Sequence, residues 1–192
     1  MLFSRIERAG TAYAASSTRY PHTVAGLSAS GVIGTADIAC QTLFQRKEGG
    51  GLDWRRTLGL TIFGGWHYGG PAKLFYLSYD KIFGVAPHLR VAAMKMVVDV
   101  YGHTPFILIP SFYIITGAFK GQTLEQSVAQ LRVEWWEASF GSALFWTPIC
   151  LANFRFTPQH SRILTVSCAS FLHKTWFSYL SNRAAHQATQ AR

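Results

Sequence analysis

Polar and charged side chains recur one helical turn apart inside stretches of the 192-residue sequence that are otherwise apolar. Asp37 and Gln41 are four residues apart, and so are Asp99 and His103. Residues at this spacing lie on the same face of a helix. Inside a membrane, such a pair can line a polar path and carry protons, or it can join two helices by hydrogen bonds. We favour the second role for both pairs, because a single Asp and His pair does not specify a proton relay.

His67 and Asn153 are two further polar residues in apolar stretches. Pro71 stands one turn after His67, where a second metal ligand would be expected. We therefore interpret His67 as an interior histidine held by hydrogen bonds, and Asn153 as a polar contact between helices. The candidates for interhelical polar contacts or for the lining of a pore are Asp37, Gln41, His67, Asp99, His103 and Asn153.

Sequence motifs of catalysis and of metal binding are absent. The chain has no G-x-S-x-G elbow, no H-E-x-x-H and no paired C-x-x-C, and its run of three glycines at 49–51 is not followed by G-K-[ST]. Cys40, Cys150 and Cys168 lie in apolar stretches without paired spacing, so we interpret them as small core residues. We expect no catalytic, cofactor-binding or metal-binding residues, and we expect that the protein is not an enzyme.

The composition is that of a basic membrane protein. Hydrophobic residues make up 49% of the chain and charged residues 14%, whereas soluble domains contain about 25% charged residues. Lys and Arg outnumber Asp and Glu by 18 to 9, which gives a net charge of +9. No basic cluster with interleaved aromatic residues is present, so we expect membrane lipids and not nucleic acid as partners. The one bound group that this charge would suit is a phospholipid such as cardiolipin.

The longest uncharged stretch predicts a helix that crosses a bilayer. Residues 100–119 contain no Asp, Glu, Lys or Arg, and their number matches the thickness of the hydrocarbon core. A buried helix of a soluble core is the alternative, but a chain of this length has little room for several such helices. We predict an all-α, multi-pass transmembrane helical bundle, with residues 1–192 as a single membrane domain. Its four spans are residues 22–44, 54–83, 91–119 and 138–154, and a fifth hydrophobic helix covers residues 163–181.

Small residues at four-residue intervals predict close contacts between these helices. Gly26, Ser30 and Gly34 form one such series, and Gly65 and Gly69 form a G-x-x-x-G motif. A kink is expected just after this motif, at Gly70 and Pro71. The predicted helix-packing residues are Gly26, Ser30, Gly34, Gly65, Gly69 and Pro71.

Two segments are predicted to lie along the membrane surface. Residues 1–20 are basic and contain only one acidic residue, Glu7, which is typical of a mitochondrial presequence. We expect them to be retained as an interfacial helix. Residues 124–137 have an apolar side and four charged residues, and they should lead into the next span. Basic residues near the ends of the spans are candidates for contacts with lipid head groups: Arg55, Arg56, Lys95 and Arg162.

Several short motifs follow one another along nearly the whole chain. The N-terminal half contains Y-P at 20–21, G-T-A-D-I-A-C-Q at 34–41, D-W-R-R-T at 53–57 and G-P at 70–71. The C-terminal half contains P-F at 105–106, Trp146, N-F at 153–154, Pro158, Arg162 and W-F-S-Y-L-S at 176–181. Their joint order resembles that of the small integral membrane proteins of mitochondria and peroxisomes named after Mpv-seventeen and the twenty-two-kilodalton peroxisomal membrane protein.

This resemblance implies four membrane spans and a role commonly described as a small-solute channel. The chain departs from the family pattern at three positions: Thr147 replaces the usual proline, and Val100 and Cys150 stand where glutamine is usual. If those glutamines line a conduction path, this chain has lost part of it. We therefore expect an accessory structural subunit of a respiratory-chain or ATP synthase complex in the mitochondrial inner membrane. The alternative is a non-selective small-solute channel of the mitochondrial or peroxisomal membrane, lined by Asp37, Gln41, Asp99 and His103.

Overall fold

Helices and short connections make up the part of the chain that the computed structural model describes, residues 2–43 and 51–172. No strand occurs within these residues, which confirms the prediction of an all-α fold. The helices are α1 (Leu2–Arg19), α2 (Pro21–Leu43), α3 (Trp54–Gly69), α4 (Pro71–Phe83), α5 (Leu89–Val98), the π-helix η1 (Asp99–Leu108), α6 (Ile109–Phe119), α7 (Leu124–Phe156) and a last apolar helix (Arg162–Leu172).

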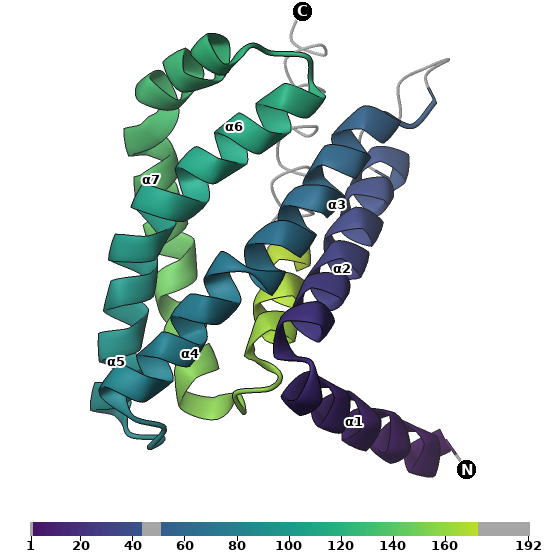
Figure 1. Cartoon of the computed structure of the whole chain (residues 1–192), viewed down its shortest axis with the longest axis vertical. Helices are drawn as coiled ribbons and strands as arrows, with labels where there is room; N and C mark the ends of the chain where they lie inside the picture. Colours follow the sequence, from purple (N-terminus) through teal and green to yellow (C-terminus); the bar gives the residue numbers. More distant parts are fainter. Residues whose placement is uncertain (1, 44–50, 173–192) are drawn as a thin grey trace, which may run out of the picture.

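The small residues of α2 and α3 bring these two helices into backbone contact. A Cβ atom added to Gly69 would lie 2.9 Å from the Cα of Gly26, and one added to Gly26 would lie 3.0 Å from the carbonyl oxygen of Gly65. The hydroxyl of Ser30 donates a hydrogen bond to the carbonyl oxygen of Thr61 at 3.1 Å. The two series of small residues thus face each other, and α2 and α3 run side by side (Figure 1).

The predicted second span is interrupted at Gly70, where the sequence analysis expected a kink. α3 ends at Gly69 and α4 begins at Pro71, which occupies the first turn of the new helix. Proline is well suited to this position, because the first turn needs no backbone N–H donor. In Figure 1, α4 continues from the end of α3 toward the lower left of the view.

The predicted third span is helical from Leu89 to Phe119, and its centre is the π-helix η1. Pro105 lies inside η1 and provides no backbone N–H. Its carbonyl oxygen accepts a hydrogen bond from the indole Nε1 of Trp135 at 2.8 Å. A side chain of α7 therefore satisfies part of the irregular backbone, as is usual for proline inside membrane helices.

Residues 124–154 form one helix, although the sequence predicted an interfacial helix and a separate span. α7 begins with a capping box, in which Thr123 and Gln126 bond to each other's backbone N–H groups, and it continues for 33 residues. No glycine or proline stands at the expected junction between Glu137 and Ala138, so nothing in the sequence ends the helix there. Pro148 lies inside α7 without ending it.

One of the described helices, α2, is both long and apolar enough to cross a bilayer. The predicted spans 54–83 and 91–119 are each divided between shorter helices. The predicted span 138–154 belongs to α7, whose N-terminal part contains charged residues. The four-span arrangement therefore stays a prediction. Of the fifth hydrophobic helix, the structure describes Arg162–Leu172, and residues 173–181 lie outside the described range.

The helices enclose a core of small and aromatic side chains. α1 extends away from the other helices (Figure 1), and the Ser17 hydroxyl near its end donates a hydrogen bond of 3.0 Å to the carbonyl oxygen of His160. The buried core is contributed by α2 to α5, η1, α7 and the last helix, and includes Ala29, Ala72, Tyr76, Ala92, Val100, Phe154 and Ile163.

Candidate functional site: a half-open cavity and three polar clusters

A cavity of about 1200 Å³ lies between α2, α3, η1, α6, α7 and the last helix. Apolar and aromatic side chains, among them Ile33, Leu60, Phe63 and Phe112, form much of its wall. Eight residues with carboxylate, imidazole, ammonium or guanidinium side chains also line it: Asp37, Arg56, His67, Asp99, His103, Lys120, Glu134 and Glu137. Four of the six polar candidates from the sequence line this cavity, namely Asp37, His67, Asp99 and His103.

Asp37 is the centre of a polar cluster that joins α2 to α3. Its Oδ2 accepts hydrogen bonds from Gln41 Nε2 at 2.7 Å and from the Thr57 hydroxyl at 2.8 Å. Its Oδ1 accepts from Arg56, with Nε at 3.0 Å and Nη2 at 2.9 Å. The side-chain oxygen of Gln41 also accepts from the backbone N–H of Asp53 at 2.6 Å. Every oxygen of this buried carboxylate thus has a donor.

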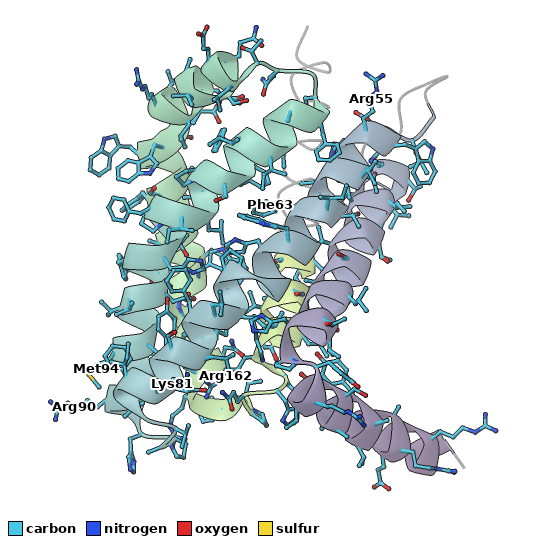
Figure 2. The ribbon with its side chains drawn as sticks, in the orientation of Figure 1. Arg55, Phe63, Lys81, Arg90, Met94 and Arg162 are labelled. Atoms are coloured by element: carbon cyan, nitrogen blue, oxygen red, sulfur yellow. The ribbon has the colours of Figure 1, made fainter. Side chains whose placement is uncertain are left out.

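This cluster changes the role predicted for Arg56. Arg55 is exposed at the start of α3 (Figure 2), where it can still meet lipid head groups. The next residue, Arg56, turns back to Asp37, because a half-exposed guanidinium can reach a buried carboxylate on the neighbouring helix. Thr57, which the sequence did not single out, belongs to the same cluster.

Asp99 is the centre of a second buried cluster, near the middle of the bundle. His103 Nδ1 lies 3.0 Å from Asp99 Oδ1, as the four-residue spacing predicts. The hydroxyls of Tyr76 and Tyr79 donate to the same carboxylate at 3.3 and 3.4 Å, and the Cys150 thiol lies 3.6 Å from Oδ2. The cluster therefore connects η1 to α4 and α7.

His67 lies beside this cluster but forms no hydrogen bond within the described residues. Its ring is fully buried and is stacked between Phe63 and His103, with ring centroids 5.4 and 5.2 Å away. Within the described residues the predicted hydrogen bond of His67 is therefore not found, and the two neighbours stacked on its ring present their faces to it. His103 Nε2 also has no partner within the described residues.

Asp80 is the centre of a third cluster, which the sequence did not predict. Lys95 Nζ donates to its Oδ1, and Arg162 Nη1 lies 2.8 and 3.0 Å from its two oxygens. Arg162 Nε also donates to the carbonyl oxygen of Thr157 at 3.2 Å. Asn153 connects to the same region, since its Nδ2 donates to the carbonyl oxygen of Arg162 at 3.4 Å.

Lys95 and Arg162 were predicted to contact lipid head groups, and the structure contradicts this. Lys95 is 1% exposed and Arg162 is 6% exposed. Both cations point inward because the Asp80 carboxylate of α4 lies between them. The sequence could not reveal this arrangement, since Asp80 is 15 residues from Lys95 and 82 residues from Arg162.

At the side of the cavity between α6 and α7, Glu134 accepts two hydrogen bonds. The Tyr113 hydroxyl donates to Oε2, and Gln130 Nε2 donates to Oε1 at 3.0 Å. The hydrogen bond from Tyr113 has the larger effect and that from Gln130 the smaller, and both hold the pKa of Glu134 below its usual range. This pair of helices is thus joined by a polar contact that the sequence analysis missed.

All three cysteines were predicted to be small core residues. Cys40 and Cys150 are buried as predicted. Cys168, which comes directly after the buried Val166 and Ser167, is exposed, so the prediction was wrong for this residue. Within the described residues, no group of three or more His, Cys, Asp or Glu side chains is arranged to hold a metal ion.

The chain is similar to membrane proteins of mitochondria over most of its length. The profile of the Mpv17 / PMP22 family matches residues 117–181. The mitochondrial inner membrane protein Mpv17 of Danio rerio is 32% identical, over 90% of this chain and 94% of its own. The protein of the same name from Homo sapiens is 29% identical (90% and 96%), and protein SYM1 of Eremothecium gossypii is 27% identical (90% and 96%). No solved structure matches the chain.

Proposed function

The chain belongs to the Mpv17 / PMP22 family, and from this premise we propose that it is a multi-pass protein of the mitochondrial inner membrane that lets small polar solutes pass through its cavity. The names of the relatives from Danio rerio and Homo sapiens support this location. The proposal includes the four spans 22–44, 54–83, 91–119 and 138–154, and it assigns the protein no catalytic role.

The cavity is the observation that carries this proposal. Charged and polar side chains inside a membrane protein are unfavourable unless they face partners or water, and they commonly mark solute pathways. Here the carboxylates of Asp37 and Asp99 and the stacked rings of His67 and His103 all line a single cavity. This favours the second of the two functions that the sequence left open.

A bulky side chain in the cavity should stop passage without disturbing the fold. Gly141 lines the cavity, and a Cβ atom added to it would meet nothing within 4 Å. The full chain is reconstituted into liposomes, and the efflux of a trapped small polar dye is measured. We expect Gly141→Trp to reduce efflux severalfold, because Gly141 is an exposed residue of the cavity lining and an indole there would narrow the open side of the cavity.

Gly31→Trp is the matched control. Gly31 is also a helical glycine whose added Cβ would meet nothing within 4 Å, but it lies on the exposed side of α2 and outside the cavity lining. Efflux through this variant should equal that of the unaltered protein. If both variants conduct like the unaltered chain, passage through this cavity is refuted.

An accessory structural subunit is the second candidate, and the outer face of α7 favours it. Four large apolar side chains on this face, Val133, Trp136, Phe140 and Leu144, are each at least 74% exposed. They form a row that helices of another subunit or lipid tails can cover. The buried polar clusters, each joining two or more helices, also suit a protein that serves as a scaffold.

Native electrophoresis of gently solubilised mitochondria separates the two candidates. A structural subunit should migrate with a respiratory-chain or ATP synthase complex, and its depletion should destabilise that complex. A channel should migrate as a small oligomer. Peroxisomes fractionated in parallel test the alternative location.

A further inference from the structure

The last helix (Arg162–Leu172) forms part of the cavity wall. Val166 and Ser170 line the cavity from this helix. Two of its other residues, Ile163 and Ser167, are at most 1% exposed, so the helix is also packed against the rest of the bundle. The width of the cavity therefore depends on what holds this helix in place.

Arg162 connects the start of the last helix to α4 through a buried ion pair. Its Nη1 donates to both oxygens of the Asp80 carboxylate, at 2.8 and 3.0 Å. The two residues are 6% and 7% exposed. Figure 2 shows Arg162 beside α4. Arg162 is the one charged residue of Arg162–Leu172, so this part of the chain has no second ion pair that could hold it.

Arg162 lies on the same face of the last helix as the two residues that line the cavity. Arg162, Val166 and Ser170 follow one another at intervals of four residues. At a rise of about 1.5 Å per residue, Ser170 lies about 12 Å from Arg162 along the helix axis. A tilt of the helix by about 10° at Arg162 would thus move Ser170 by about 2 Å. A small change at the ion pair would therefore displace the wall of the cavity.

Neighbouring groups fix both members of this ion pair. Lys95 Nζ of α5 donates to Asp80 Oδ1 and holds the carboxylate from the other side. Arg162 Nε donates to the carbonyl oxygen of Thr157 at 3.2 Å, and Asn153 Nδ2 donates to the carbonyl oxygen of Arg162 at 3.4 Å. Asp80, Lys95 and Arg162 are not among the residues that line the cavity. Their effect on it is therefore exerted through the helix that begins at Arg162.

We propose that the ion pair between Asp80 and Arg162 positions the last helix as a wall of the cavity and thereby limits the size of the solutes that pass. Asp80 and Arg162 are positioning residues, since neither touches a solute inside the cavity. The limit on solute size rests on the proposed function. The position of the helix does not, because it can be measured without any transport.

Two substitutions each remove one cation from this cluster and leave one ion pair. Arg162→Met disconnects the last helix and leaves Asp80 paired with Lys95. Lys95→Met is the matched control, because Asp80 stays paired with Arg162. One cation balances the carboxylate in either variant, so neither substitution leaves a buried charge without a partner. Arg162→Lys keeps the charge and should behave nearly like the unaltered chain.

Spin labels on the purified full chain measure the position of the last helix. Cys168 provides an exposed thiol on this helix, and Gly31→Cys adds one at an exposed position of α2, while the other two cysteines are buried. Electron paramagnetic resonance gives the distance between the two labels. We expect this distance to shift, or its distribution to broaden, when Arg162→Met is added. It should stay unchanged when Lys95→Met is added.

Efflux from liposomes measures the limit on solute size. Two trapped polar dyes are compared, a small one and a larger one that the unaltered protein releases slowly. We expect Arg162→Met to release the larger dye severalfold faster, because a helix that is not held by Asp80 no longer closes this side of the cavity. Release of the small dye should change little. Lys95→Met should release both dyes like the unaltered protein.

An unchanged label distance in Arg162→Met overturns the proposal. An equal shift in Lys95→Met also overturns it, because a general loosening of the cluster would then explain the result. A shifted label distance with an unchanged release of the larger dye refutes the limit on solute size. If the unaltered chain releases neither dye, the proposed function itself fails and the size limit with it, and the label distances still decide whether the ion pair positions the helix.

Discussion

The Asp37 carboxylate shows how this chain accommodates charge in an apolar interior. Burial of a carboxylate is unfavourable unless its oxygens are bonded, and Asp37 receives donors from Gln41, Thr57 and Arg56. Two of these donors come from α3, so the carboxylate holds the ends of α2 and α3 together. The side chain therefore stabilises the protein whether or not it also lines a solute path.

Asp37→Ala should lower the free energy of unfolding by about 1–3 kcal/mol, because it leaves buried donors without an acceptor. The measurement is denaturant unfolding of the purified chain in detergent. Arg55→Gln serves as the control: Arg55 is exposed one residue before Arg56 and should change the stability by less than about 0.5 kcal/mol. Equal stability of the Asp37→Ala variant and the unaltered chain would contradict the interhelical role of Asp37.

At the scale of helices, backbone contact between α2 and α3 replaces side-chain packing. The approach of Gly69 to Gly26 is closer than any Cβ atom permits. The indole of Trp135 has a comparable role elsewhere, because it bonds to the carbonyl oxygen of Pro105 and so connects α7 to η1. Both contacts depend on single residues, which makes them suitable for substitution.

Gly69→Ala should separate α2 from α3 and destabilise the protein by about 1–3 kcal/mol, since its methyl group would overlap Gly26. Gly31→Ala, in the same helix pair, should instead stabilise it by about 0.5–1 kcal/mol. Its methyl group meets nothing, and alanine favours a helix. Thermal unfolding of both variants in one detergent decides the matter, and a similar midpoint for the two would contradict the close contact.

Trp135→Phe should reduce the free energy of unfolding by about 1 kcal/mol, because it removes the indole donor and keeps most of the ring. Trp136→Phe is the control for this change. Its side chain is 76% exposed, and no hydrogen bond involves it within the described residues. If the two substitutions have equal effects, the bond to Pro105 does not stabilise η1.

At the scale of the whole molecule, local patterns predicted more than distant ones. The pairs at four-residue spacing, Asp37 with Gln41 and Asp99 with His103, are in contact as expected. The position of Asp80 between Lys95 and Arg162 depends on how three helices are arranged, and a single sequence does not contain that arrangement. The missing hydrogen bonds of His67 have the same origin, because only the fold determines which rings surround it.

The proposed span at 54–83 predicts that its two ends lie on opposite sides of the membrane. Gly51 and Ala86 are exposed and flank this segment. In a Cys168→Ser background, which removes an exposed thiol, the variants Gly51→Cys and Ala86→Cys are treated with a membrane-impermeant thiol reagent in sealed vesicles. We expect one to be labelled before detergent is added and the other only afterwards. Labelling of both from the same side would refute the span.

The π-helix η1 determines how far α6 is rotated about the helix axis relative to α5. A π-turn contains more residues than an α-turn, so each residue rotates the chain less about its axis. Across Asp99–Leu108 this difference accumulates, and it determines which sides of α6 and of the following chain face the bundle. Removal of a single residue from η1 would therefore act far from its own position, because it would rotate the side of α6 that contributes to the cavity away from it.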